Sequence, residues 1–485
     1  MQRFCTLAFV LGLILMIFGL TYSLPIAASL YFNDGMTEHF LRGMSLNIGI
    51  GGILAGSTMQ FRGDVKNRDG YLLVAFFWLL MASAATLPLM WGLPGLSFTD
   101  AFFETMSGFT TTGATVLVGL DDLPQSVNLW RHELNWIGGL GIIVLAVAIL
   151  PLLGVGGMQL YKAEIPGPVK DSKITPRITE TARLLWLVYV GYTLLCIASL
   201  KIAGMSWFDA ICHSFSTLSL GGFSTHDASI GHFDSPAIEL VITVFMLISG
   251  MNFATHYTAI HHTNLKAYSL DPEAFPMLGL IISTIVLCAV YISHFDIYPD
   301  FLSGLRYVSF NTVSLATGTG YSSTDYSLWP PFIPWLILFL SGVTPCTGST
   351  GGGIKMFRAL LLLKQANREL FSILHPRAVN PIRIGQTPIA NKIIFAVLAF
   401  IFLYFISVVL MTFTLMFSGM DPVTAVSAVM ACINNTGPGL NTVGPASNYA
   451  HLNDFQTWVC AITMLLGRLE VFTLVVLFTP TFWRK

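Results

Sequence analysis

The stretch SFTDAFFETMSGFTTTGATV, residues 97–116, begins like an apolar membrane helix, but this apolar part is too short to cross a bilayer. It predicts a half-helix of roughly ten residues, followed by extended backbone rich in small polar residues and glycine. Three later stretches share this organisation: SWFDAICHSFSTLSLGGFST (206–225), FLSGLRYVSFNTVSLATGTGY (301–321) and DPVTAVSAVMACINNTGPGL (421–440). The third is the most divergent, so its alignment with the others is the least defined. Together the four stretches indicate a fourfold internal repeat.

Extended backbone in these stretches cannot face lipid, because its unpaired carbonyl groups would find no hydrogen-bond partner there. We therefore expect the stretches to surround a water-filled path as pore loops. The partly negative C-terminal ends of the half-helices would point toward the axis of this path, which favours a cation. An ordinary outer loop with a turn glycine is the alternative for any single stretch, but four at near-regular intervals favour pore loops.

Each stretch contributes one glycine to the predicted filter, namely Gly113, Gly222, Gly318 and Gly437. Glycine allows backbone conformations that turn carbonyl oxygens inward, and rings of such carbonyls can replace the hydration shell of a potassium ion. The predicted potassium-binding residues are Thr111, Thr112, Gly113, Leu220, Gly221, Gly222, Thr317, Gly318, Thr319, Asn435, Thr436 and Gly437.

The composition indicates a membrane protein. The 485-residue chain is 54% hydrophobic and only 10% charged, with a mean hydropathy of +0.71. Ordinary soluble domains carry about 25% charged residues, and the net charge of −1 argues against a nucleic-acid partner. A helix needs roughly 20 apolar residues to span a bilayer. Apolar runs near this length occur at 6–32, 41–60, 71–91, 136–153, 184–203, 238–258, 276–293, 332–343, 393–418 and 457–479.

We therefore predict an all-α polytopic membrane protein in contact with lipid. Four span–pore-loop–span repeats would surround a pseudo-fourfold pore, preceded by two N-terminal transmembrane helices. The predicted units are an N-terminal transmembrane hairpin at 1–69 and pore repeats 1 to 4 at 70–160, 161–265, 266–375 and 376–485.

Lysine and arginine predict the orientation, because cytoplasmic loops carry an excess of both. If both termini are cytoplasmic, Arg42, Arg131, Lys201 and Arg306 are the basic residues outside, and Arg468 lies within a span. No small-residue cleavage site follows the first apolar run, so we expect a retained helix rather than a signal peptide.

The second span of repeat 3 is predicted to be interrupted. The apolar run 332–343 is followed by TPCTGSTGGG (344–353), and a proline with four glycines cannot hold a regular helix. A phosphate-binding P-loop is disfavoured, because Ile354-Lys355 follows the glycines where Lys-Ser/Thr would be required. We expect an intramembrane loop bordering water beneath the filter; a passive helix break that serves packing is the alternative.

Arg468 lies in the apolar run 457–479, where a charge costs about 2.5–3.5 kcal/mol on insertion scales. Glu470 lies about 200° around a helix from it, so the two side chains should not pair. We expect Arg468 to place a positive charge beneath the filter. The alternative is an arginine bound to helix-end carbonyl groups.

Three stretches carry a family resemblance: NWIGGLGIIVLAVAILP (135–151), TPCTGSTGGGIK (344–355) and GRLEVFTLVVLFTP (467–480). With the four pore loops, they resemble the Trk/Ktr/HKT superfamily of potassium transporters, and most closely its bacterial TrkH-type subunits, over nearly the whole chain. The resemblance implies that the four aligned glycines form a selectivity filter, and that Gly113 in place of serine favours potassium over sodium.

The resemblance also implies a gate and partners. The implied gate residues are Thr347, Gly348, Ser349, Thr350, Gly351, Gly352, Gly353 and Arg468. The implied assembly is a homodimer in the bacterial inner membrane, controlled by a nucleotide-binding cytosolic ring protein of the TrkA type.

The expected function is potassium uptake across the inner membrane through a gated, channel-like pore. A proton-coupled potassium symporter on the same fold is the main alternative, with Glu470 as a weak candidate for the titrating group. A membrane scaffold or sensor with a non-conducting pore is a further alternative. An enzyme is not expected, because the sequence shows no HExxH motif, catalytic triad or metal-ligand spacing, and none of its seven cysteines lies in a CxxC pair.

Overall fold

The computed structural model describes residues 2–61, 63, 67–141, 178–378, 380–385 and 387–484. The predicted end of the span 136–153 and the boundary at residue 160 lie outside these residues. Helices account for nearly all of the described regular structure, with one short β-hairpin formed by β1 (Arg383–Ile384) and β2 (Thr387–Pro388). The fold is therefore all-α, as predicted.

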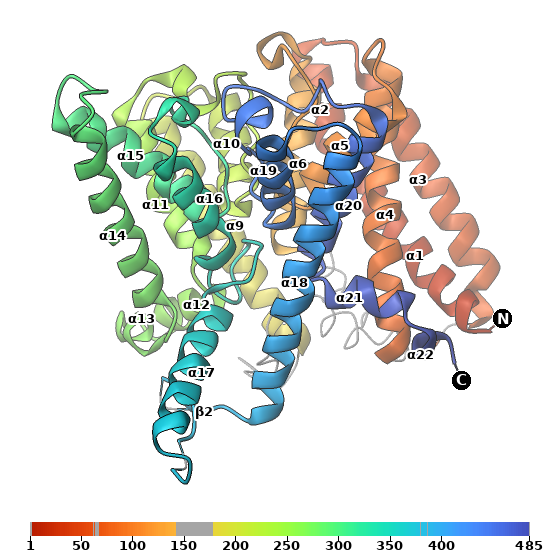
Figure 1. Ribbon diagram of the computed structural model, residues 1–485. Coiled ribbons are helices and arrows are strands. Elements are labelled where there is room, and N and C mark those ends of the chain that lie inside the picture. The colour runs from red at the N-terminus through yellow and green to blue at the C-terminus, as the bar shows by residue number, and fades with distance from the viewer. Residues whose placement is uncertain are drawn as a thin grey trace.

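We describe the helices in chain order, grouped by the predicted N-terminal unit and four repeats (Figure 1). The N-terminal unit contains α1 (Gln2–Thr21), α2 (Ser23–Phe32), α3 (Thr37–Thr58) and η1 (Met59–Phe61). Repeat 1 contains α4 (Asn67–Gly92), α5 (Phe98–Phe109), η2 (Leu120–Asp122) and α6 (Gln125–Leu140). Repeat 2 contains α9 (Ile178–Ile202), α10 (Trp207–Ser219), η3 (Ser229–Phe233), α11 (Pro236–Gly250) and α12 (Phe253–His261).

The last two repeats continue the same pattern of long helix, short helix and second helix. Repeat 3 contains α13 (Lys266–Leu270), α14 (Ala274–Ser293), α15 (Phe301–Ala316), η4 (Tyr326–Leu328), α16 (Phe332–Val343) and α17 (Met356–Leu374). Repeat 4 contains α18 (Asn391–Phe417), α19 (Pro422–Ile433), η5 (Asn441–Val443), α20 (Asp454–Arg468), α21 (Phe472–Val475), η6 (Val476–Phe478) and α22 (Pro480–Trp483). Both termini lie at the same end of the helix bundle (Figure 1).

A side-chain cap starts each of the four short helices α5, α10, α15 and α19. In each, the side-chain oxygen of the cap accepts the backbone N–H three residues later, which satisfies one of the free donors of the first turn. The caps are Ser97, Ser206, Asp300 and Asp421. These polar residues, found in the sequence just before each apolar half-helix, fix where the half-helices begin.

Among the described residues, five helices are long and apolar enough to cross a membrane, or up to seven spans if two bent pairs are each counted as one. The bent pairs correct two predictions, because the runs 238–258 and 457–479 were expected to be continuous spans. The chain turns by 97° between α11 and α12, where Asn252 caps α12 by accepting the N–H of Ala254. It turns by 106° after α20, where Glu470 and Val471 both have positive φ. Neither break contains a proline.

The buried polar residues concentrate in the short helices and their loops, within a core that is otherwise apolar, and many large apolar residues are exposed on the outer helices. The short helices bury most of their serine, threonine and asparagine side chains, whereas α14 and α18 expose residues such as Leu287, Phe402 and Phe413. Lipid tails are as apolar as these exposed side chains, so this distribution suits a bilayer. The buried polar residues of the short helices and their loops are therefore the candidates for a functional site.

Candidate functional site

The four loops that follow the short helices share one backbone conformation. In each, a backbone N–H donates to the carbonyl five residues earlier, and the distance is 2.8 Å in every loop. We call the donor the middle position of its loop. The middle positions are Thr112, Gly221, Thr319 and Thr436.

Positive φ occurs on both sides of every middle position. The residues before it are Thr111, Leu220, Gly318 and Asn435, with φ between 53° and 79° in all four loops. The residues after it are Gly113, Gly222, Gly320 and Gly437, with φ of 78°, 68°, 87° and 89°. Glycine adopts positive φ without the steric cost that other residues meet, which suits the last position of each loop.

The four loops close into a ring. The Cα of Gly113 lies so close to the carbonyl oxygen of Gly221 that no side chain fits between them. The same close approach joins Gly222 to Thr319 and Gly320 to Thr436. Gly437 completes the circle, because a Cβ on it would lie 2.6 Å from the carbonyl oxygen of Thr112. The last position of each loop must therefore be glycine for reasons of space as well as φ.

The structure corrects the predicted alignment of repeat 3 by two residues. Gly320, rather than Gly318, occupies the place of Gly113, and Thr317 corresponds to Thr110 rather than to Thr112. A hydroxyl pair supports this alignment, because Thr110 and Thr112 lie 2.7 Å apart through their Oγ1 atoms, as do Thr317 and Thr319.

The loop of repeat 3 is displaced because the third short helix is longer than the other three. α15 has 16 residues, whereas α5, α10 and α19 have 12, 13 and 12. The additional turn displaces the loop relative to its helix cap. The structure also shows that repeat 4 is not longer than repeats 1 and 2, since Asp421 is a helix cap like Ser97 and corresponds to that residue rather than to Asp100.

A buried polar side chain on each short helix supports the chain just beyond the ring. Glu104 accepts the N–H of Val116 at 3.0 Å, Asn311 accepts that of Ser323 at 3.2 Å, and Ser427 accepts that of Leu440 at 2.9 Å. In repeat 2, His213 Nε2 lies 3.0 Å from the hydroxyl of Ser224. We call these four side chains the braces.

Arg131, predicted to lie on the outer side, is fully buried beside the brace of repeat 1 and lines the cavity described below. Its Nε donates to Glu104 at 2.7 Å, and its Nη1 donates to the carbonyl of Ser224 at 3.1 Å. The guanidinium carbon lies 4.3 Å from the centre of the Phe223 ring. Arg131 therefore ties the brace of repeat 1 to the loop of repeat 2.

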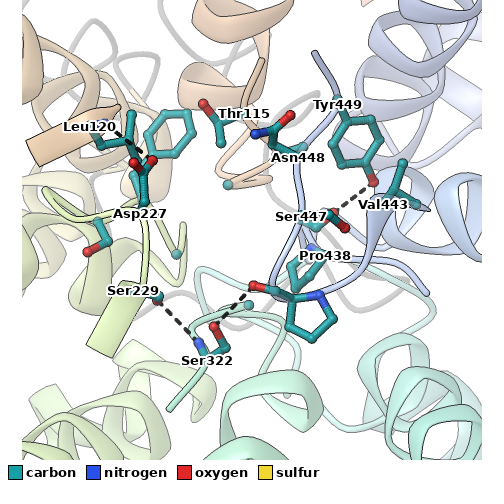
Figure 2. A pocket seen from close by; sticks show the side chains of 18 of the residues that line it. Thr115, Leu120, Asp227, Ser229, Ser322, Pro438, Val443, Ser447, Asn448 and Tyr449 are labelled. Atoms are coloured by element: carbon teal, nitrogen blue, oxygen red, sulfur yellow. Dashed lines mark hydrogen bonds between the residues drawn. The ribbon is translucent and has the colours of Figure 1, made fainter. Parts of the chain in front are cut away.

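An open cavity lies on one side of the ring. Figure 2 shows segments from all four repeats around it. Its lining includes Gly113, Gly222, Gly320 and Gly437, together with the residues that follow them. We call this cavity the mouth. A small ion in the mouth would meet the ring directly.

The predicted gate segment, residues 347–353, lies on the opposite side of the ring. The hydroxyl of Thr350 donates to the carbonyl of Leu218 at 3.1 Å. A Cβ on Gly352 would lie 2.5 Å from the carbonyl oxygen of Asn434, and one on Gly351 would lie 3.1 Å from that of Thr317. The segment therefore contacts backbone at the base of repeats 2, 3 and 4.

Arg468 completes these contacts on the side of repeat 1. Its Nη1 donates to Thr111 Oγ1 at 3.2 Å and to the carbonyl of Thr350 at 3.0 Å. Its Nη2 donates to the carbonyls of Gly138 and Gly139. Arg468 thus lies beneath the ring, as expected, and it is also bound to helix-end carbonyls, which was the alternative.

Glu273 holds both ends of the gate segment, which the sequence did not suggest. A single oxygen, Oε2, accepts the N–H of Thr347 at 2.8 Å and that of Phe357 at 3.1 Å. Glu273 lies one residue before α14, where burial raises its pKa to about 7 although the two N–H groups act in the opposite direction. Two further backbone bonds, from Cys346 N to Gly250 O and from Phe253 N to Gly348 O, attach the segment to the break between α11 and α12.

Comparisons with known proteins assign the chain to a family. The family model of TrkH, described as a cation transport protein, matches residues 37–295 and 300–485. The chain belongs to the TrkH family. It is 46% identical over 485 residues to the Trk system potassium uptake protein TrkH of Salmonella typhimurium, with both chains fully covered. It is 47% identical over 477 residues to the protein of that name from Halomonas elongata, covering 98% of each chain.

A solved structure supports the same assignment. The crystal structure of the potassium transporter TrkH from Vibrio parahaemolyticus superimposes with a TM-score of 0.89 at 41% identity, covering 99% of this chain and 100% of that one. The resemblance found in the sequence is therefore confirmed, and so is an all-α, multi-pass membrane fold. TrkH proteins are transport proteins, so this chain is a transporter rather than an enzyme.

Proposed function

We propose that this TrkH protein takes up potassium through a channel-like pore whose filter is the ring of four loops. The observation that carries the proposal is the closed ring, in which every loop has the same 2.8 Å turn and the same alternation of positive φ. Such a ring presents backbone carbonyls to a dehydrated monovalent cation. The printed names of the relatives, potassium uptake proteins, agree with this choice of ion.

The proposed path runs from the mouth, through the ring, to the gate segment. Potassium ions lose water at the carbonyl rings of the first, middle and last positions, using the corrected residues Gly318, Thr319 and Gly320 in repeat 3. The gate segment and Arg468 close the path beneath the ring, because together they contact all four repeats there. Displacing the segment opens the path.

The proton-coupled alternative has less support. Glu470, the carboxylate suggested for it, forms an ion pair with Arg358, whose Nη2 lies 2.5 Å from its Oε2. The ion pair gives this carboxylate a structural partner, and no described contact places it among the groups that line the mouth. Uptake that is insensitive to an imposed pH gradient would support the channel-like mechanism, whereas uptake that follows the gradient would support the symporter.

Partners and setting remain part of the proposal. A homodimer in the bacterial inner membrane with both termini cytoplasmic, and a nucleotide-binding ring of the TrkA type on that face, follow from the family resemblance and the distribution of basic residues. The regulatory partner can be tested by purifying the chain together with such a ring protein. We expect the two proteins to separate when nucleotide is removed.

The decisive experiment measures ion flux. The purified chain is placed in liposomes, and entry of potassium, rubidium and sodium is compared under equal gradients. We expect potassium and rubidium to enter faster than sodium. A non-conducting scaffold predicts no flux of any of the three ions, and equal flux of all three contradicts the filter.

A further inference from the structure

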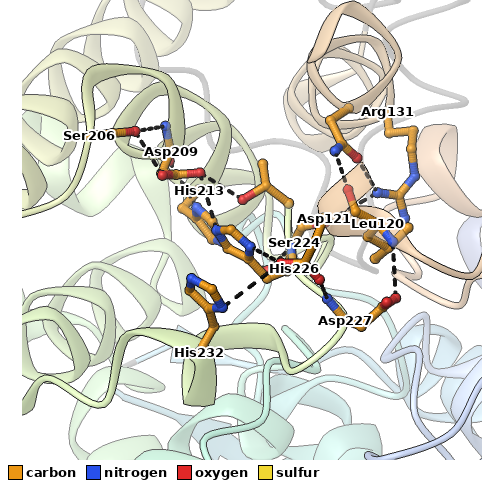
Figure 3. Close-up of polar contacts among 12 residues, drawn as sticks. Leu120, Asp121, Arg131, Ser206, Asp209, His213, Ser224, His226, Asp227 and His232 are labelled. Atoms are coloured by element: carbon orange, nitrogen blue, oxygen red, sulfur yellow. Dashed lines mark hydrogen bonds and ion pairs between the residues drawn. The ribbon is translucent and has the colours of Figure 1, made fainter. Parts of the chain in front are cut away.

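Three side chains with metal-ligating atoms meet at the edge of the mouth and belong neither to the proposed filter nor to the gate segment. They are Asp121 in η2, His226 in the chain that follows the ring of repeat 2, and His232 in η3. One ligating atom from each lies within 4.8 Å of the others. Figure 3 shows Asp121 and His226 directed toward one another across the boundary between repeats 1 and 2, with His232 beside them.

Asp121 is held so that one of its oxygens faces the two histidines. Its Oδ2 accepts the backbone N–H of Asp227 at 3.1 Å, and Asp227 Oδ1 in turn accepts the N–H of Leu120 at 3.2 Å. Its Oδ1 contacts Nδ1 of His226 and lies 3.9 Å from Nδ1 of His232. The loops of repeats 1 and 2 thus bring a carboxylate and two imidazoles to one point without using Asp121 Oδ1 for backbone structure.

The surroundings of His226 are those of a metal-ligating histidine. When one imidazole nitrogen binds a metal, the other commonly faces a carboxylate that orients the ring. Nε2 of His226 lies 3.6 Å from Oδ1 of Asp209, and among the described residues no hydrogen bond reaches this buried nitrogen. Asp209 is itself fixed by the hydroxyls of Ser206 at 2.7 Å and Thr225 at 2.8 Å.

We propose that Asp121, His226 and His232 form a site for a transition-metal dication of the zinc type at the outer edge of the mouth. Two imidazoles and one carboxylate suit zinc, copper or nickel, whereas magnesium, calcium and potassium prefer oxygen ligands alone. Zinc binds such ligands at about 2.0–2.2 Å, so the three ligand atoms must draw closer together. Because a metal binds the neutral imidazole nitrogen, any proton on a ligating nitrogen leaves when the metal binds.

His232 is the residue that moves. The rings of His226 and His232 are stacked, with centroids 3.5 Å apart and an angle of 2° between planes, so their nitrogen lone pairs do not yet converge. The side chains of His232 and Asp121 are 45% and 44% exposed. A turn of the exposed His232 ring brings its nitrogen toward Asp121 Oδ1, and the exposed side of the cluster leaves a fourth position for water.

Metal at this site slows the entry of ions. His226 and Asp227 line the mouth together with the four ring glycines. A bound dication would add positive charge there and lock the loops of repeats 1 and 2 together, and like charge at a pore entrance lowers the local concentration of potassium. The effect on flux rests on the proposed function, whereas binding of the metal does not.

The test measures zinc binding and flux separately on the full-length chain. Calorimetry with zinc chloride should show one zinc per chain, and cobalt chloride should give the visible absorption of a four-coordinate site. H232A should weaken zinc binding at least tenfold, and H226A/H232A should remove it. H294A, which changes an exposed histidine at the end of α14, should leave the affinity unchanged and serves as the matched control.

Flux in liposomes gives the second readout. Zinc added on the mouth side should reduce rubidium entry, and H232A should raise the half-inhibiting zinc concentration at least tenfold. Zinc affinity that is equal in the wild type and in H226A/H232A overturns the site, and stoichiometric binding without any change in flux overturns its effect on entry. A chain that binds zinc but conducts nothing in its absence contradicts the proposed function instead.

Discussion

At the scale of single residues, repeat 3 distinguishes two glycines that look equivalent in the sequence. Gly318 and Gly320 both have positive φ, but a Cβ on Gly318 has no neighbour closer than 3.9 Å, whereas one on Gly320 would collide with the carbonyl of Thr436. The other repeats hold Thr111, Leu220 and Asn435 at the place of Gly318. Of the two positions, therefore, only position 320 requires glycine both for lack of space and for positive φ.

We predict that Gly318→Asn preserves the preference for rubidium over sodium, because asparagine tolerates left-handed φ and repeat 4 already has one there. Gly320→Ala should lower the rubidium-to-sodium flux ratio several-fold, since strain of about 1–2 kcal/mol from φ adds to the clash in the ring. Flux ratios in liposomes measure both. Equal loss of selectivity in the two variants would contradict the corrected alignment.

A second prediction at this scale concerns the ion pair behind repeat 1. Glu104 and Arg131 are both fully buried, with side chains 0% and 1% exposed. Glu104→Ala leaves the guanidinium without its carboxylate, which should lower the free energy of unfolding by about 3–5 kcal/mol. Glu104→Gln keeps an acceptor for Val116 and should cost less.

Thermal unfolding of the detergent-solubilised chain, followed by tryptophan fluorescence, compares these variants. Ser427→Ala is the matched control, because it removes the brace of repeat 4 without leaving a buried charge. Glu104→Ala should have the lowest midpoint of the three. A midpoint for Glu104→Ala no lower than that of Ser427→Ala would mean that the buried pair is not needed for stability.

At the scale of elements, Glu273 connects α14 to the gate segment. Because one oxygen accepts both Thr347 N and Phe357 N, Glu273→Ala should release both ends of the segment and raise basal rubidium flux several-fold. Glu273→Gln retains a side-chain oxygen in the same place, so its flux should lie between those of the alanine variant and the wild type. Flux that is unchanged in Glu273→Ala, with the fold intact, would show that other contacts hold the segment.

The sequence could predict those elements whose position is set by neighbouring residues in the chain. Local signals predicted the four short helices, the interruption at 344–353 and the position of Arg468 beneath the loops, since polar caps, glycine runs and a charge in an apolar run are visible in the sequence. The added turn of α15 was missed, because two glycines two residues apart gave two possible alignments. The breaks after α11 and α20 were missed because contacts distant in sequence stabilise them, as the bond from Cys346 N to Gly250 O shows. The Glu104–Arg131 pair and the Asp121–His226 contact likewise join residues that no sequence spacing relates.

At the scale of the whole molecule, the ring is closed by four loops of one chain. Every close contact that completes it, including the return from Gly437 to Thr112, is made within a single polypeptide. Buried polar side chains lie on the short helices and loops of the same chain, and many large apolar side chains are exposed on its outer helices. Each chain should therefore contain a complete path, whether or not two chains associate.

This arrangement makes a quantitative prediction for mixed assemblies. When wild-type chains are reconstituted together with chains disabled by Gly320→Val, rubidium flux should fall in direct proportion to the fraction of disabled chains, because each path depends on one chain only. A pore shared between two chains would instead make flux fall with the square of the wild-type fraction. Two affinity tags report the composition of the assemblies, and a mixture of differently tagged wild-type chains controls for reconstitution. A quadratic decrease in flux would contradict a pore within each chain, and with it the fourfold ring as the conducting filter.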